Sequence, residues 1–188
     1  MTRVVFLTHA EVEIDPGVAV PDWGLSEVGR ARHSAFAVGA PAFGAVFSST
    51  ERKAKEGAAP VAERLGLEVR TGAALGENDR SATGYLPKPE FEATADRFFA
   101  QPDASVRGWE RAHDAQARIV SAVRDAVAET RPEGDVLIVA HGGVGALLRC
   151  HLLDRDITRA EDQPHPGGGC WYAFPASMDV GPTPWRAI

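Results

Sequence analysis

Two histidines stand at the ends of apolar runs. His9 follows Val4-Val5-Phe6-Leu7-Thr8, and His141 follows Val136-Leu137-Ile138-Val139-Ala140. Continuous apolar runs of this length are typical of strands buried on both faces, and open α/β sheets bind ligands at the carboxyl ends of such strands. Imidazole changes its charge near neutral pH and can also act as a nucleophile. The two runs therefore predict one site that contains both histidines.

Groups that favour an anion flank this histidine pair. Gly142 follows His141 and opens a predicted helix, whose first N–H groups and dipole attract negative charge. Ser48 stands near the end of another predicted strand, and Arg52 and Lys53 follow in the first turn of the next helix. Imidazoles, a hydroxyl and cations at neighbouring strand ends indicate a site for a small anionic substrate.

The elements that position these residues follow from the hydrophobic pattern. Strands alternate with helices along the chain, and this alternation predicts an α/β fold, a three-layer α/β/α sandwich with a mainly parallel sheet. Strands are expected at residues 3–8, 45–49, 67–70, 136–140 and 170–174, and the C-terminal tail can pair as an edge. Helices are expected at about 26–38, 50–65, 90–100, 109–130 and 143–153, with a break over 131–134.

The length of 188 residues predicts a single domain over residues 1–188. The regular pattern loosens between about residues 72 and 108. We expect this segment to be an insertion over the site, a lid that selects the substrate. The sequence does not specify the oligomeric state, so both a monomer and a homodimer remain open.

The overall charge and the apolar pattern exclude several classes of protein. With 20 Lys and Arg against 26 Asp and Glu, the formal net charge is −6, which argues against a nucleic-acid partner. The N-terminal apolar run is too short for a membrane span or a signal peptide, so we expect no membrane association and a cytoplasmic location. Cys150 and Cys170 are expected to be reduced core residues. The remaining histidines are expected to be surface or partly buried residues: His33, His113, His151 and His165.

Five segments, in this order, resemble the motifs of the histidine phosphatase superfamily, which has the phosphoglycerate-mutase-like fold. They span nearly the whole chain. They are Leu7-Thr8-His9-Ala10-Glu11, Trp23-Gly24-Leu25-Ser26-Glu27-Val28-Gly29, Ser48-Ser49-Thr50-Glu51-Arg52-Lys53-Ala54-Lys55-Glu56-Gly57-Ala58, Glu77, and Val139-Ala140-His141-Gly142-Gly143.

The resemblance implies a two-step phosphoryl transfer that needs no metal or other cofactor. His9 would attack phosphorus and carry the phosphoryl group. Glu77, at the position of the family's acid/base carboxylate, would protonate the leaving oxygen and later activate water. His141 and two arginines would hold the phosphoryl oxygens.

The chain departs from the family pattern at both arginines. Thr8 stands where the first arginine is expected, and the second falls on Lys53, with Arg52 one residue early. Thr8 offers one hydroxyl and no charge, and removing one charged donor to a transition-state oxyanion costs on the order of 10²–10³ in rate. Arg80, in the loop after Glu77, is the candidate for the missing cation.

These departures leave three hypotheses open. The first is a phosphomonoester hydrolase that acts on a small phosphorylated metabolite through phospho-His9. The second is an enzyme that uses His9, Glu77 and His141 for acid–base chemistry on a non-phosphorylated biosynthetic substrate. The third is a non-catalytic module that binds an anion. The sequence does not identify the substrate.

Overall fold

Four parallel strands, from the edge strand β3 to β1, form one side of a six-stranded sheet with the order β3-β2-β4-β1-β5-β6. The computed structural model describes residues 2–130 and 134–188. β5 is antiparallel to β1, and the tail strand β6 pairs antiparallel to β5 as an edge. The strands are β1 (Arg3–Thr8), β2 (Phe43–Ser48), β3 (Val69–Thr71), β4 (Asp135–Ala140), β5 (Cys170–Pro175) and β6 (Arg186–Ala187).

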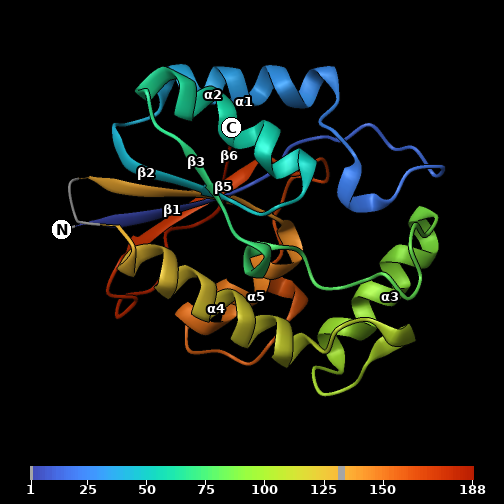
Figure 1. Ribbon diagram of the computed structural model, residues 1–188. Helices are drawn as coiled ribbons and strands as arrows, with labels where there is room; N and C mark the ends of the chain where they lie inside the picture. The colour runs from blue at the N-terminus through green and yellow to red at the C-terminus, as the bar shows by residue number, and fades with distance from the viewer. Residues whose placement is uncertain (1, 131–133) are drawn as a thin grey trace.

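Helices cover both faces of this sheet. α1 and α2 lie on one face and α4 and α5 on the other, while α3 lies beside α5, away from the sheet (Figure 1). The predicted three-layer α/β/α architecture is therefore confirmed. The helices are α1 (Glu27–Gly39), α2 (Arg52–Leu65), α3 (Lys88–Ala100), α4 (Ala112–Ala128) and α5 (Gly142–Leu152). Short 3-10 turns are η1 (Val20–Asp22), η2 (Ala73–Leu75), η3 (Val106–Gly108) and η4 (Arg159–Glu161).

Local chemistry sets several helix ends where the sequence predicts them. The hydroxyl of Ser26 accepts the N–H of Gly29 at 3.1 Å and caps α1. Gly66 ends α2 with a φ of 65°, a left-handed conformation that suits glycine. The break expected over residues 131–134 lies largely outside the described residues.

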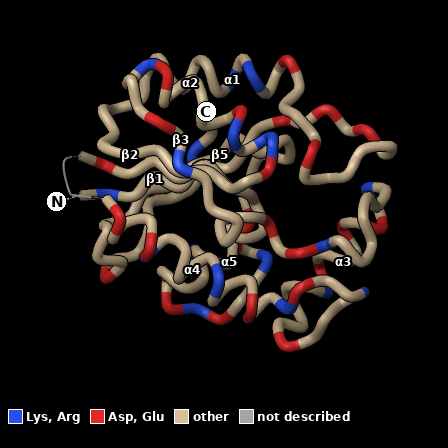
Figure 2. Tube along the Cα trace, in the orientation of Figure 1, with Lys and Arg blue, Asp and Glu red and all other residues tan. Residues whose placement is uncertain are grey.

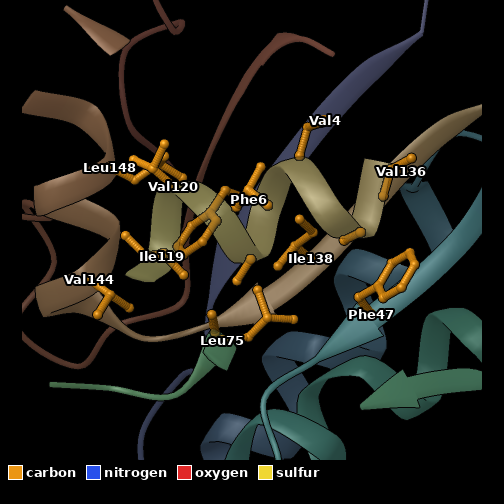
Figure 3. Close-up of a cluster of buried hydrophobic side chains, with 14 of the residues drawn as sticks. Val4, Phe6, Phe47, Leu75, Ile119, Val120, Val136, Ile138, Val144 and Leu148 are labelled. Carbon is orange, nitrogen blue, oxygen red and sulfur yellow. The ribbon is translucent and has the colours of Figure 1, made fainter. Parts of the chain in front are cut away.

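The core forms on both faces because side chains alternate along each buried strand. From β1, Val4 and Phe6 point to the α4 and α5 side, and Val5 and Leu7 point to the α1 and α2 side. Figure 3 shows the core cluster on the α4 and α5 side of the sheet, with Phe6 beside the apolar face of α4. Within the part of the chain that the structure describes, no helix has the length and apolar character needed to cross a membrane.

Pairing of β1 with β4 brings the two histidine motifs to the same edge of the sheet. Thr8 lies opposite Ala140 in this parallel pair, and the N–H of His9 donates to the carbonyl of Ala140 at 3.0 Å. His9 and His141 therefore leave their strands at the same level.

Candidate active site

The predicted pair of histidines lies at the carboxyl ends of β1 and β4. The ring centroids of His9 and His141 are 5.2 Å apart, with an angle of 68° between the ring planes. The side chain of His141 is only 1% exposed, whereas His9 is half-buried. The sequence prediction of one site built from both strands agrees with this geometry.

His9 is oriented for nucleophilic attack through Nε2. Its Nδ1 lies 2.9 Å from the carbonyl oxygen of Ala10, which can only accept a hydrogen bond. Nδ1 therefore carries the proton, and the lone pair of Nε2 is available. Burial, followed by repulsion from His141 and Lys53, holds the pKa of His9 well below its usual range, so the ring is neutral.

His33 fixes the turn that carries His9. Its Nε2 accepts the N–H of Ala10 at 3.1 Å, and its side chain, which comes from α1, is fully buried. Burial is the main cause that lowers the pKa of His33 to about 4. The expectation that His33 is a surface or partly buried residue was wrong, because the face of α1 that packs on the core holds this ring against the end of the first strand.

His141 is held through its other ring nitrogen. Nε2 lies 2.8 Å from Oγ of Ser49 and 3.2 Å from Oε1 of Glu51. Nδ1 is buried and has no hydrogen-bond partner among the described residues. Burial lowers the pKa of His141, although the carboxylates of Glu51 and Glu77 oppose this shift.

Glu77 lies at the N-terminus of α5. Its carboxylate accepts the N–H groups of Gly143 and Val144, each at 3.0 Å, and lies 3.1 Å from Nη2 of Arg80. Burial alone would raise the pKa of Glu77, but Arg80, His141 and the backbone donors outweigh it and lower the pKa to about 2. Glu77 is therefore ionised, and it occupies two of the helix N–H groups that the sequence predicts for an anion.

Gly142 is the first residue of α5, as predicted, and it lies beside Gln163, which was not predicted from the sequence. A Cβ at Gly142 would lie 2.5 Å from Nε2 of Gln163, so the glycine makes room for this amide. The N–H of Gly142 has no hydrogen-bond partner among the described residues. Gly142 therefore stays a predicted donor to a substrate oxygen.

The side chain of Thr8 is hydrogen-bonded to the side-chain amide of Gln163. Its Oγ1 lies 2.6 Å from Oε1 of Gln163 and accepts the N–H of Cys170 at 2.9 Å. The first distance is typical of an O–H···O bond, so the hydroxyl donates to Oε1 and turns Nε2 of Gln163 toward Gly142. Thr8, at the sequence position where the family pattern has its first arginine, thus orients a neutral donor.

Arg52 and Lys53 are neighbours in the sequence at the start of α2, but their side chains point in different directions. Lys53 is 4% exposed, and its Nζ donates to the carbonyl of Val20 at 2.8 Å and lies 2.5 Å from Oε2 of Glu51. Arg52 is exposed and pairs with Glu56 at 2.7 Å. The structure therefore corrects the assignment of Arg52 as a phosphate ligand, because adjacent helical residues point about 100° apart.

Arg80 lies beside Glu77 between two aromatic rings. Its guanidinium is 4.9 Å from the ring centroid of Phe91 and 5.0 Å from that of Trp109. Nε donates to Oδ1 of Asn78 at 3.0 Å, which leaves Nδ2 of this buried asparagine without a partner among the described residues. Arg80 thus reaches the site, but its charge is already paired.

The hydroxyl of Ser48 points away from the histidines and donates to the carbonyl of Ser49 at 2.9 Å. The hydroxyl at His141 comes from Ser49, so the assignment of Ser48 as a phosphate ligand is also corrected. Glu51 is another residue of the site that was not predicted, although it lies inside the motif from Ser48 to Ala58. The signal was its position just before α2, three residues after the end of β2.

The charges of the site balance within this chain. Glu51 is paired with Lys53, and Glu77 with Arg80, so these two ion pairs carry no net charge. Among residues 2–130 and 134–188, no three His, Cys, Asp or Glu side chains form a group that could hold a metal ion.

Comparisons with known proteins identify the family of this chain. Residues 4–174 match the model of the histidine phosphatase superfamily (branch 1). Glucosyl-3-phosphoglycerate phosphatase of Mycobacterium tuberculosis is 31% identical in an alignment of 167 residues that covers 80% of this chain and 75% of that protein. A mycobacterial glucosyl-3-phosphoglycerate phosphatase in complex with VO3 aligns with a TM-score of 0.76 and 26% identity, covering 99% of this chain and 97% of that one. Bacillus stearothermophilus YhfR has the same fold, with a TM-score of 0.77, 24% identity and coverage of 92% and 90%.

Proposed function

The chain belongs to branch 1 of the histidine phosphatase superfamily and is a phosphatase-like hydrolase, and we propose that it hydrolyses a phosphomonoester of a small metabolite through a phosphohistidine at His9. The observation that carries this proposal is the free Nε2 of His9. Nδ1 is tied to the carbonyl of Ala10, so the nucleophilic lone pair has one defined direction, beside His141.

In the first step, Nε2 of His9 forms a bond to phosphorus while the bond from phosphorus to the leaving oxygen breaks, and this oxygen takes a proton. In the second step, water attacks phosphorus, the N–P bond breaks, and inorganic phosphate leaves. Glu77 is ionised in the free site, as the group that takes the proton of the attacking water in the second step must be, and a pKa closer to neutral would make it a stronger base. To act as the acid of the first step, Glu77 must be protonated, so its pKa must rise. A bound phosphate anion raises this pKa by like-charge repulsion.

For the substrate, we propose a phosphorylated sugar or sugar acid. The support is the sequence relative whose name describes a phosphatase for glucosyl-3-phosphoglycerate. The segment over residues 72–108 remains our proposed lid. Tyr85 of this segment packs on Trp23 of the N-terminal loop, with ring centroids 5.7 Å apart, so the segment spans from α3 to the loop that precedes α1.

The test is hydrolysis of para-nitrophenyl phosphate from pH 5 to 8 by the wild type and His9→Ala, together with acid quenching to trap phosphoenzyme. We expect turnover and an acid-labile phosphohistidine in the wild type, and at least a 10³-fold loss in His9→Ala. A wild type that neither turns over nor forms phosphoenzyme with a broad panel of sugar phosphates would overturn the proposal.

The charge balance of the site favours a second candidate. Because each cation already faces a carboxylate of this chain, the site can also take a substrate without a phosphate dianion, with His9, Glu77 and His141 doing acid–base chemistry. Under this alternative, the wild type is inert toward every phosphate ester in the panel. It also has no measurable affinity for inorganic phosphate by calorimetry.

A further inference from the structure

Glu51 contacts His141 from the buried side of the site. Its side chain is 14% exposed, and Oε1 lies 3.2 Å from Nε2 of His141. This carboxylate is itself fixed, because Oε2 pairs with Lys53 at 2.5 Å and Oε1 accepts the N–H of Glu77 at 3.2 Å. The proposed reaction assigns no role to Glu51.

The oxygens around Nε2 determine where His141 carries its proton. A carboxylate can only accept hydrogen bonds, so Nε2 facing Glu51 is the protonated nitrogen. The hydroxyl of Ser49, 2.8 Å from Nε2, can accept from the same N–H. A neutral imidazole has one proton, and therefore Nδ1 is left with its lone pair. Nδ1 is also the ring atom that is buried without a partner among the described residues.

We propose that Glu51 is a positioning residue, which holds the proton of His141 on Nε2, supports the imidazolium form, and so presents Nδ1 to the phosphoryl group. The inference deepens the proposed function and rests on it for the identity of that group. As an imidazolium, His141 donates Nδ1–H to a phosphoryl oxygen and supplies positive charge that Thr8 does not. Carboxylates orient and support histidines in the same way in catalytic triads and metal sites.

The charged groups around His141 act in opposite directions. Glu51 and Glu77 favour the imidazolium, whereas Lys53, Arg80 and burial oppose it, and His9 faces the same ring. Because burial is the largest of these effects, the free site holds a neutral His141 at pH 7. A phosphate dianion adds negative charge and favours protonation. Removing the charge of Glu51 shifts the balance toward the neutral ring.

The first test is nitrogen-15 NMR of the imidazoles over pH 4 to 9 in the wild type, Glu51→Gln and Glu51→Leu. We expect His141 of the wild type to be the Nε2–H tautomer. Glu51→Gln keeps an acceptor oxygen, so we expect the same tautomer with a pKa lower by about one pH unit. Glu51→Leu should lose the tautomer preference as well. Glu63→Gln, an exposed position on the same helix with the same change in charge, should leave both properties unchanged.

The second test is the pH dependence of kcat/KM for para-nitrophenyl phosphate. Activity that needs the imidazolium falls as pH rises through the pKa of His141. We therefore expect the alkaline limb to move to lower pH in Glu51→Gln, with about a tenfold loss at neutral pH, and not in Glu63→Gln. A residue that only maintained the fold would lower kcat/KM equally at all pH values.

Two results would overturn the inference: a wild-type His141 with its proton on Nδ1, or an unchanged pKa of His141 in Glu51→Gln that folds normally by circular dichroism. The NMR measurement needs no turnover. A chain that is inert toward phosphate esters but has the expected tautomer and pKa shift would therefore refute the phosphatase proposal while supporting the role of Glu51.

Discussion

Thr8 stands at the sequence position where an arginine is expected, and its side chain is bonded to that of Gln163. The hydroxyl of Thr8 holds Oε1 of Gln163 at 2.6 Å, and the amide nitrogen lies over Gly142. An arginine side chain that leaves position 8 in the direction of this hydroxyl meets the amide. The two residues therefore have to change together if the site is to regain an arginine.

At the scale of the residue, we predict that Thr8→Arg alone does not increase phosphatase activity and that it lowers stability, because the new side chain is overpacked against Gln163. The double variant Thr8→Arg with Gln163→Ala opens space for the guanidinium. We expect it to raise kcat/KM for para-nitrophenyl phosphate by about 10²-fold over Gln163→Ala. The measurements are steady-state kinetics and thermal denaturation of the four proteins of this cycle. If Thr8→Arg gains as much activity alone as with Gln163→Ala, the amide does not occupy that space.

At the scale of the element, α4 positions Glu77 through a single arginine. Arg118 donates to the carbonyls of Ala74, Gly76 and Glu77 at 2.8, 3.0 and 3.1 Å, and pairs with Glu110 at 2.8 Å. These bonds tie the loop after η2 to a helix whose other face is in the core. The carboxylate of Glu77 can reach the N-terminus of α5 because this loop is fixed.

We predict that Arg118→Ala lowers kcat in the proposed reaction by about tenfold and the free energy of unfolding by about 2 kcal/mol, since several hydrogen bonds to a charged group are lost. Arg111→Ala is the matched control near the start of the same helix. Among the described residues, Arg111 forms its ion pair with Asp114 on the surface, where both side chains are about half exposed, so little change is expected. Urea denaturation and steady-state kinetics on para-nitrophenyl phosphate measure both effects. Equal losses in both variants would contradict this role of Arg118.

The elements themselves could be predicted from the sequence, whereas several contacts of the site could not. Apolar runs and helix caps such as Ser26 act over a few residues, so the order of strands and helices follows from local pattern. The bond between Thr8 and Gln163 joins positions 155 residues apart, and no local pattern encodes it. His33 was misplaced for the same reason, because its partner Ala10 comes from another element.

At the scale of the whole molecule, acidic and basic residues are interspersed over both helical layers (Figure 2), and the formal net charge is −6. The net charge repels an anionic substrate at long range, so the local cations and N–H donors of the site have to provide the attraction. We therefore expect added salt to weaken binding only modestly, because paired, buried charges are screened less than exposed ones.

The lowered pKa values of the buried Glu77 and His33 predict how the protein loses stability in acid. Glu77 has a pKa of about 2 in the folded chain against an ordinary value of 4.5. The unfolded chain therefore binds more protons below pH 4.5, and the stability that ionised Glu77 contributes is lost as pH falls from about 4.5 to about 2. His33 has a pKa of about 4 against an ordinary value of 6.5. Its contribution is present above pH 6.5 and is lost as pH falls toward 4.

We predict two successive losses in the free energy of unfolding on acidification, to which His33 and Glu77 each contribute about 3 kcal/mol. The first lies below pH 6.5 and should be smaller in His33→Gln, which keeps an acceptor for the N–H of Ala10, while His9 and His141, whose pKa values are also lowered, still contribute. The second lies below pH 4.5 and should be smaller in Glu77→Gln, in which other carboxylates with a lowered pKa still contribute. Urea denaturation at closely spaced pH values from 7 to 2.5 measures the free energy of each protein, and Glu63→Gln controls for the change in net charge. If Glu77→Gln loses stability below pH 4.5 as steeply as the wild type does, Glu77 is not the ionised anchor of α5, and its role as the base for the attacking water fails with it.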